Sequence, residues 1–274
     1  MATSPPQPTI TRDALDALHA RLNRREFVHP DPLEVLYDYP DLADREIAGF
    51  VAACLSYGRV RSIVKSVRTV LGRMPSPARF LAGASPKALR EALADFKHRF
   101  ATGRDLAALL LGVKRLVKRH GSLQAAFVAG LSADHDDVVP ALIRFATEVR
   151  EAAGGLDAHL LPCPTRGSAC KRLNLFLRWM VRRDAVDPGG WDAVSPAKLL
   201  VPLDIHMHRI CRALGLTRRD SADLRTAIEV TNAFKAFAPD DPVRYDFALT
   251  RLGIRPGPEA DLDAFLAEWG SSRL

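Results

Sequence analysis

The stretch Asp41–Gly58, DLADREIAGFVAACLSYG, shows the pattern that decides the fold. Its apolar residues recur at helical spacing and form one stripe, made of Ile47, Phe50, Val51, Cys54 and Leu55. Asp41 or Asp44 can cap the start of this helix, and Gly58 suits its C-terminal end. A stripe of this kind predicts a helix that buries one face against other helices.

The same periodicity continues along the chain and predicts an all-α protein of roughly ten to twelve helices. Thr11 is the expected N-cap of a helix that runs to about Arg24. Further helices are expected at about 60–73, 85–99, 104–119, 121–130, 136–153, 168–183, 204–214, 222–237, 241–252 and 259–269. Only the short apolar run Leu199–Leu203 suggests extended chain. Residues 1–10 are expected to form a disordered tail.

Composition bounds the class of protein. The chain has 274 residues, 47% of them hydrophobic, a formal net charge of +7 and a pI of about 9.5. No run of about 18 apolar residues is present and the N-terminus lacks the core of a signal peptide, so we expect a cytoplasmic protein. The positive charge favours a polyanionic partner, and nucleic acid is the usual one.

The cysteines and histidines do not predict a metal site. The four cysteines are scattered and include no C-x-x-C pair, so we expect reduced, buried thiols and neither zinc nor an iron–sulfur cluster. His206 and His208 are two apart on a predicted helix and point in different directions, so they are poorly placed to share one ion. We therefore expect no metal and no cofactor.

A lysine in the segment LLPCPTRGSACKRLNLFLRWMVR, residues 160–182, is a candidate nucleophile. A proline-constrained loop ends at Gly167, and Ser168 is placed to cap the next helix, which makes a natural phosphate site. Lys171 follows in the first turn, where the helix dipole and Arg172 both favour a neutral amine. A neutral amine can act as a nucleophile. The alternative is a surface lysine on an amphipathic helix.

A carboxylate in the segment LVPLDIHMHRICR, residues 200–212, is its candidate partner. Asp204 follows the extended apolar run and begins a helix, so an N-cap alone would account for it. A carboxylate fixed by a helix N-terminus also stays ionised and oriented, which suits it to face a developing cation.

Together these two segments resemble the helix-hairpin-helix superfamily of DNA glycosylases. In that superfamily a helix-hairpin-helix element carries a catalytic lysine, and a signature of the form P-[VL]-D-x-H-[VI]-x-R supplies an aspartate. Pro202–Arg209, PLDIHMHR, follows that signature. The chain is also similar, over about residues 35–255, to a bacterial family that shares the runs GSACKRLNLFLRWMVR, PLDIHMHRI and DPVRYDFAL.

The spacing of the two candidate residues narrows the resemblance. The 33 residues from Lys171 to Asp204 exceed the separation in endonuclease III-like enzymes and are similar to that of the archaeal 8-oxoguanine glycosylase branch. Two features depart from the superfamily. The hairpin reads LPCPTRG at 161–167 in place of L-P-G-[VI]-G, and the C-terminal cluster cysteines of endonuclease III are absent.

The resemblance implies a fold, a reaction and a set of site residues. It implies two helical lobes with a DNA cleft between them, one of about residues 46–172 and the other of about 11–45 with 173–274. Lys171 would attack and Asp204 would stabilise the developing charge. Substrate would be bound by Tyr57, Arg59, Phe176, Trp179 and Asp246, with Tyr57 or Arg59 as the side chain that fills the gap left by a flipped nucleotide. DNA phosphates would be bound by Arg166, Gly167, Ser168, Arg172, His206 and Arg209.

The expected function is therefore a bifunctional DNA glycosylase and AP lyase of base excision repair, acting as a monomer on double-stranded DNA that contains a damaged base. The lesion would be an oxidised base such as 8-oxoguanine, although an oxidised pyrimidine and an alkylated base fit the same pair. The alternative is a catalytically altered helix-hairpin-helix protein that binds damaged or structured DNA. A metal-dependent nuclease is disfavoured because no carboxylate cluster suited to Mg²⁺ is present.

Overall fold

The structure, a computed structural model, describes residues 10–156, 159–252 and 261–270 and is mostly helical, as predicted. In these residues the α-helices are α1 (Arg12–Leu22), α2 (Leu42–Leu55), α3 (Val60–Leu71), α4 (Pro77–Gly83), α5 (Pro86–Ala92), α6 (Gly103–His120), α7 (Leu123–Val128), α8 (Val139–Ala152), α9 (Lys171–Val181), α10 (Ile205–Ala213), α11 (Leu224–Lys235), α12 (Asp246–Arg251) and α13 (Leu262–Gly270). Short 3₁₀ helices are η1 (Arg25–Phe27), η2 (Pro32–Asp38), η3 (Pro164–Arg166) and η4 (Pro196–Lys198).

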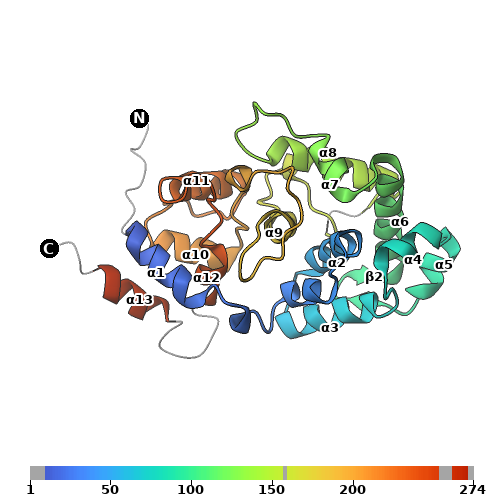
Figure 1. Cartoon of the computed structure of the whole chain (residues 1–274), viewed down its shortest axis with the longest axis horizontal. Coiled ribbons are helices and arrows are strands. Elements are labelled where there is room, and N and C mark those ends of the chain that lie inside the picture. The colour runs from blue at the N-terminus through green and yellow to red at the C-terminus, as the bar shows by residue number, and fades with distance from the viewer. Residues whose placement is uncertain (1–9, 157–158, 253–260, 271–274) are drawn as a thin grey trace.

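Helix α9 lies in the middle of the molecule (Figure 1). Helices α2 to α8 lie on one side of it, and α1 and α10 to α13 lie on the other. On the first side α2 packs against α9 and α6 packs against α8, while on the second side α1 packs against α12. Helices α1 and α12, far apart in sequence, are therefore brought together, and the central helix contributes its apolar residues to the core between the two groups.

Capping residues account for several helix starts. The side chain of Thr11 accepts a hydrogen bond from the Ala14 amide, and that of Asp41 accepts one from Asp44. Both predicted caps are thus confirmed, with Asp41 rather than Asp44 in the capping position. The predicted cap at Ser168 is wrong, because α9 begins only at Lys171.

The segment 85–102 differs most from the prediction. Helix α5 ends at Ala92, and the chain then forms an antiparallel hairpin of β1 (Lys97–His98) and β2 (Ala101–Thr102). Helix α4 was not expected as a separate element, and the expected helix at 241–252 begins only at Asp246. The run Leu199–Leu203 is buried and non-helical, as predicted.

The predicted division of the chain can be followed at its N-terminal end. Residues 1–9 of the predicted tail lie outside the described residues, and Ile10 is buried. Helix α1 packs against α12, whereas η2 packs against α2 and α3.

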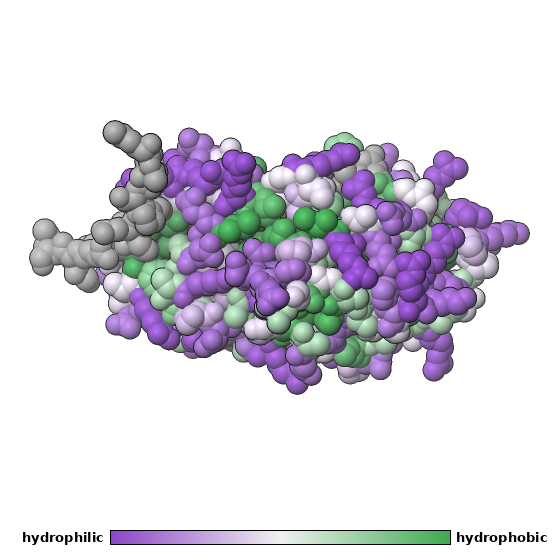
Figure 2. Space-filling view, turned by 90° about the horizontal axis from the view of Figure 1, so that it is seen from above, coloured by the Kyte–Doolittle hydropathy of each residue, from purple (hydrophilic) through white to green (hydrophobic). Residues whose placement is uncertain are grey.

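Seen from the side of α8 and α11, the surface is mainly hydrophilic with a hydrophobic strip near its middle (Figure 2). In the described residues no helix is long and apolar enough to cross a membrane.

Candidate functional site

A pocket of about 730 Å³ opens where the ends of several helices meet. Its walls come from the C-terminal end of α2, the start of α9, the start of α10 and helix α12. A volume of this size is in the range of small-molecule sites. The polar side chains of the lining are Asp31, Ser56, Tyr57, Ser168, Lys171, Arg172, Arg178, Asp204, His206, Asp246, Thr250 and Arg251.

The two predicted catalytic residues meet at this pocket. Lys171 Nζ lies 3.3 Å from Asp204 Oδ2, and their side chains are 32% and 40% exposed. Lys171 occupies the first position of α9, and Asp204 directly precedes α10. The starts of α9 and α10 thus place an amine and a carboxylate side by side within reach of solvent.

Asp204 is held by its helix as well as by the lysine. Its Oδ1 accepts a hydrogen bond of 2.9 Å from the Met207 amide, which leaves Oδ2 for Lys171. Burial pushes the pKa of Asp204 upward, but the charge of Lys171 and the Met207 amide more than offset this, so the pKa lies below its usual value. The carboxylate is therefore ionised at neutral pH and fixed in direction, and the predicted cap is confirmed.

The turn before α9 sets the position of Lys171. Cys170 adopts a left-handed backbone conformation with φ of 47° and directly precedes the helix. The Ser168 hydroxyl accepts a hydrogen bond from the Cys170 amide, so it stabilises this turn rather than the helix. Burial raises the pKa of the Cys170 thiol to about 11, which keeps it protonated beside the lysine. The thiol is thus a poor nucleophile at neutral pH.

Three buried polar atoms among the lining residues have no hydrogen-bond partner in the described chain. They are Arg251 Nε and two atoms of predicted site residues, Asp246 Oδ1 and His206 Nε2. Buried polar groups are normally paired, so an unpaired one beside a pocket indicates a place for a ligand atom. Burial raises the pKa of Asp246, although Arg178 opposes the shift. Asp246 and His206 were both predicted from the sequence as site residues, and the structure brings them to the same pocket as Lys171.

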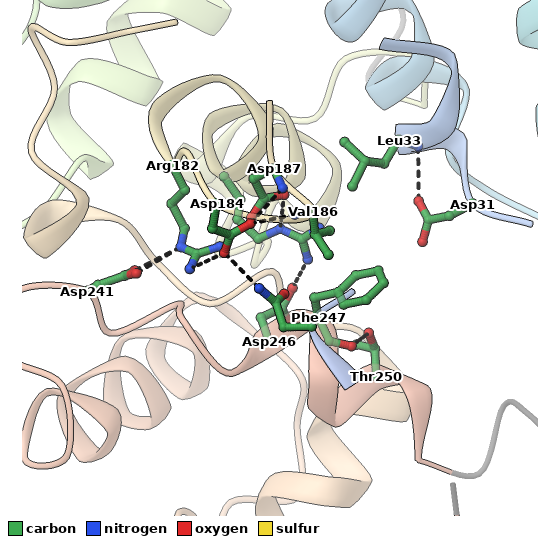
Figure 3. Close-up of polar contacts among 12 residues, drawn as sticks. Asp31, Leu33, Arg182, Asp184, Val186, Asp187, Asp241, Asp246, Phe247 and Thr250 are labelled. Atoms are coloured by element: carbon green, nitrogen blue, oxygen red, sulfur yellow. Dashed lines mark hydrogen bonds and ion pairs between the residues drawn. The ribbon is translucent and has the colours of Figure 1, made fainter. Parts of the chain in front are cut away.

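Arg178 fixes the back of the pocket. Its Nη1 donates to Asp246 Oδ2 and its Nε donates to Asp187 Oδ1 at 3.2 Å, and its side chain is only 3% exposed. Arg182 extends the network by pairing with Asp184, Asp187 and Asp241 (Figure 3). Sequence reasoning missed this role of Arg178, although it follows Lys171 by seven residues and so shares a helix face with it.

A second ion pair in the pocket wall was also missed. Asp31 Oδ1 accepts from the Leu33 amide, and its Oδ2 lies 3.0 Å from Arg251 Nη2. Arg251 also donates to the Phe27 carbonyl. The pair joins the start of η2 to α12 across 220 residues of sequence, a relation that no local pattern reveals.

Tyr57 and Arg172 are tied into the pocket wall. The Tyr57 hydroxyl donates to the His98 carbonyl at 3.1 Å, and the Arg172 guanidinium lies 5.0 Å from the centre of the Tyr57 ring. Arg172 donates to the carbonyls of Cys54, His159 and Leu160. Its prediction as a phosphate-binding residue is therefore wrong, because its donors are used within the protein.

The predicted contact of Phe176 and Trp179 with substrate is also wrong. They are 1% and 0% exposed, and the Phe176 ring packs edge-on against Phe50 and Trp191. Rings buried on all sides offer no stacking surface to a substrate, so these two side chains build the core beneath the pocket.

The remaining predicted residues lie on the surface near the pocket. Arg59, Arg166, Gly167, Ser168 and Arg209 are exposed. The Gly167 amide is already bonded to the Pro164 carbonyl, which removes one of the donors expected at this loop. Arg59 directly precedes α3 and makes no side-chain capping bond.

The described residues show no grouping of three His, Cys, Asp or Glu side chains placed to hold a metal ion. His206 faces the pocket, whereas the Nε2 of His208 bonds to the Arg219 carbonyl. The two histidines therefore point apart, as the helical spacing predicts. Cys54, Cys163, Cys170 and Cys211 are free and buried.

Comparison with known proteins adds a family but no activity. Curated proteins and solved structures give no match to the chain. The family described as "Protein of unknown function (DUF2400)" matches residues 31–255, which include every lining residue of the pocket except Pro30. Because this match spans most of the chain, the protein belongs to the DUF2400 family.

Proposed function

We propose that the protein is a bifunctional DNA glycosylase and AP lyase that excises an oxidised base through a Schiff base on Lys171. The observation that carries the proposal is the 3.3 Å contact between Lys171 Nζ and Asp204 Oδ2 at the edge of a pocket of about 730 Å³. An amine with an oriented carboxylate beside it is the equipment that a covalent glycosylase needs.

The chemistry follows from this geometry. The Lys171 amine attacks C1′ of the deoxyribose, the C1′–N bond breaks, and the base leaves with the electron pair and a proton that the ammonium has lost. The ionised Asp204 carboxylate faces the positive charge that develops on the sugar. Opening of the sugar ring gives the imine, and loss of a C2′ proton then expels the 3′ phosphate and nicks the strand.

The back of the pocket is suited to hold a base by its N–H groups. Asp246 Oδ1 is buried and unpaired, and Arg178 keeps the other carboxylate oxygen engaged. An N–H donor on the edge of a flipped base supplies the missing hydrogen bond. Unpaired His206 Nε2, on α10, provides a second polar contact. Oxidised purines such as 8-oxoguanine carry such donors.

In this proposal the helices on the two sides of α9 act as two lobes that bind the DNA duplex of the bacterial nucleoid between them. Exposed Arg166, Ser168 and Arg209 contact the phosphates on either side of the flipped nucleotide. The affinity then falls steeply with salt concentration, because each phosphate contact releases counterions.

Borohydride trapping tests the proposal directly. Mixing the protein with a duplex containing 8-oxoguanine and borohydride is expected to reduce the imine and leave a covalent protein–DNA adduct, seen as a shifted band in a denaturing gel. Lys171→Ala is expected to abolish the adduct. Lys87→Ala, which removes an exposed lysine on α5, is the matched control and is expected to trap like the wild type.

Asp204→Asn separates catalysis from capping. The amide can still accept the Met207 hydrogen bond, so the fold and DNA affinity should be kept, whereas excision should fall by about 10² or more. Undiminished trapping in Lys171→Ala, or full turnover in Asp204→Asn, would remove the assignment. Tight binding of lesion DNA with no base release by the wild type would instead favour the alternative, a damaged-DNA-binding protein with altered chemistry.

A further inference from the structure

A hairpin beside the pocket presents an aromatic ring to solvent. Among the large hydrophobic side chains of the described residues only Leu42, Phe100 and Ile205 are exposed, and Phe100 is 72% exposed. Ile205 lines the pocket, and Phe100 stands at the tip of the β1–β2 hairpin. A lone exposed aliphatic residue is ordinary, but an aromatic ring at the tip of a turn is a candidate for contact with a partner.

The turn holds this ring in an uncommon backbone conformation. His98 pairs with Ala101, so Arg99 and Phe100 form a two-residue turn. Arg99 has φ of 53°, a left-handed conformation that glycine, asparagine and aspartate adopt far more readily. Such conformations persist where surrounding contacts fix them, and they concentrate at functional positions.

Contacts at the base of the hairpin fix it against the pocket wall. The Tyr57 hydroxyl donates to the His98 carbonyl, and His98 Nε2 lies 3.0 Å from the Tyr57 carbonyl, to which it donates. His98 Nδ1 lies 2.9 Å from the Ser66 hydroxyl, which donates to it. The Tyr57 and His98 rings also pack edge to face, with their centroids 4.8 Å apart. Hydrogen bonds and ring packing thus fix the hairpin to Tyr57, a lining residue of the pocket.

The tip itself lies at the rim of the pocket. A Cβ added at Gly58 would lie 2.9 Å from Arg99 Cδ and Nη1, so the arginine side chain covers this glycine. Gly58 lines the pocket and has φ of 99°. The Arg99–Phe100 tip is therefore held at the rim of the pocket that Lys171 and Asp204 also line, on the side formed by α2 and α3.

The surface around the hairpin is positively charged and unpaired. Six exposed cations of α3, the hairpin and the start of α6 have no carboxylate partner in the described chain: Arg59, Arg61, Lys65, Lys97, Arg99 and Arg104. Farther along α3, by contrast, Arg68 pairs with Glu34 and Asp38. The cations next to the exposed ring are thus free to meet a polyanion.

We propose that the Arg99–Phe100 tip inserts into the base stack of duplex DNA, where the Phe100 ring occupies the space left by the nucleotide extruded into the pocket. The inference rests on the proposed function in one respect, namely that the partner is DNA. A ring flanked by unpaired cations fits a stack of bases bordered by phosphates. Tyr57, whose hydroxyl is bonded to the His98 carbonyl, then forms part of the pocket wall. Arg59, which has no ring, then contacts a phosphate, and neither residue is the wedge.

The polar pocket and the single exposed ring also favour DNA over a lipid surface. The same rim holds a polar pocket with an unpaired carboxylate oxygen, Asp246 Oδ1, and an ion pair. A single ring without further exposed apolar side chains on its hairpin buries little area in a bilayer, whereas one ring is sufficient to stack between bases.

Phe100→Trp provides a direct test, since the native Trp179 and Trp191 are fully buried and Trp269 is partly buried. The probe is a duplex with a tetrahydrofuran abasic-site analogue, and binding is followed independently by anisotropy of a labelled strand. Saturating duplex is expected to quench the introduced indole strongly. Leu42→Trp, at the opposite end of α2, is the matched control and is expected to show no quenching beyond that of the wild type.

The size of the stacking contribution is measured with a matched pair. Phe100→Leu keeps an apolar side chain but cannot stack and is expected to weaken binding of the abasic duplex about tenfold. Phe100→Tyr keeps a ring and is expected to bind like the wild type. Unchanged indole emission at saturation, equal affinity of Phe100→Leu, or quenching by anionic phospholipid vesicles but not by DNA each overturns the inference.

The two proposals fail in different ways. Quenching and an affinity loss without any borohydride adduct would leave the wedge standing and remove the Lys171 chemistry. A normal adduct in Phe100→Leu, together with unquenched emission from Phe100→Trp, would remove the wedge and leave the glycosylase. Absence of any DNA binding by the wild type would overturn both.

Discussion

The hairpin side and the α9–α12 side of the pocket use arginine in opposite ways. Around β1 and β2 the cations are exposed and unpaired, whereas Arg178 and Arg182 are 3% and 5% exposed and face carboxylates on every side. A buried pair stabilises mainly by leaving no charge uncompensated, and an exposed unpaired cation is available to a polyanion. A net charge of +7 therefore does not identify a binding face until the paired arginines are set aside.

The strongest test of this comparison is Arg178→Ala. The change leaves the buried carboxylates of Asp187 and Asp246 without their main partner, so the free energy of unfolding should fall by about 3–5 kcal/mol. Urea denaturation followed by circular dichroism measures the loss. Arg209→Ala, an exposed arginine on α10, is the control and should unfold at the wild-type midpoint. Equal midpoints for the two variants would show that the buried network contributes little.

The exposed cations should give the reverse result. Removing Arg59, Arg61 and Lys65 together by alanine substitution should leave stability unchanged and weaken DNA binding, with the slope of log K against log salt reduced by roughly two to three. Arg68→Ala, on the same helix but already paired with Glu34 and Asp38, should leave the slope near the wild-type value. Anisotropy titrations at several salt concentrations measure the slopes, and a slope unaltered by the triple substitution would contradict the assignment.

The smallest effect expected is the pH dependence that His98 adds. Burial lowers the pKa of His98 despite the Tyr57 carbonyl, and nearby Arg99 acts in the same direction. The folded state therefore binds fewer protons than the unfolded state, so this stability is present above about pH 6.5 and is lost as pH falls toward and through the lower folded value.

His98→Gln is expected to flatten that part of the profile. Thermal unfolding at pH 7.5 and 5.5 should show a smaller loss of Tm in the variant than in the wild type. His19, whose pKa burial also lowers, is kept in both proteins so that its contribution cancels. An identical loss of Tm in the two proteins would show that His98 stays uncoupled from the fold in this range.

The sequence predicted most of the helices because they depend on local signals, and it also led us to expect the Lys171–Asp204 pair. Thr11, Asp41 and Asp204 are capping residues whose hydrogen bonds reach only three residues along the chain. The pair itself was expected from motif resemblance, and the structure brings the two side chains to 3.3 Å. Its chemistry remains a proposal.

Features that depend on distant contacts were missed. Phe176 and Trp179 were expected to meet substrate, but both are buried, and the Phe176 ring packs against Trp191 and against Phe50 of α2, which is far away in sequence. The hairpin was not predicted because its strands have two residues each and Arg99 stands where glycine or asparagine would mark a turn. Arg172 was misassigned because its carbonyl partners lie up to 118 residues away.

The three carbonyl bonds of Arg172 have a kinetic consequence. The guanidinium joins the C-terminal end of α2, through Cys54, to the chain at His159 and Leu160 that leads into α9. Widening the mouth of the pocket between Tyr57 and Lys171 requires these bonds to break. The cavity is thus preorganised, so its ordering cost is met during folding rather than on encounter. In the proposed function, association of the protein with DNA should accordingly be limited by diffusion and by extrusion of the nucleotide, not by rearrangement of the protein.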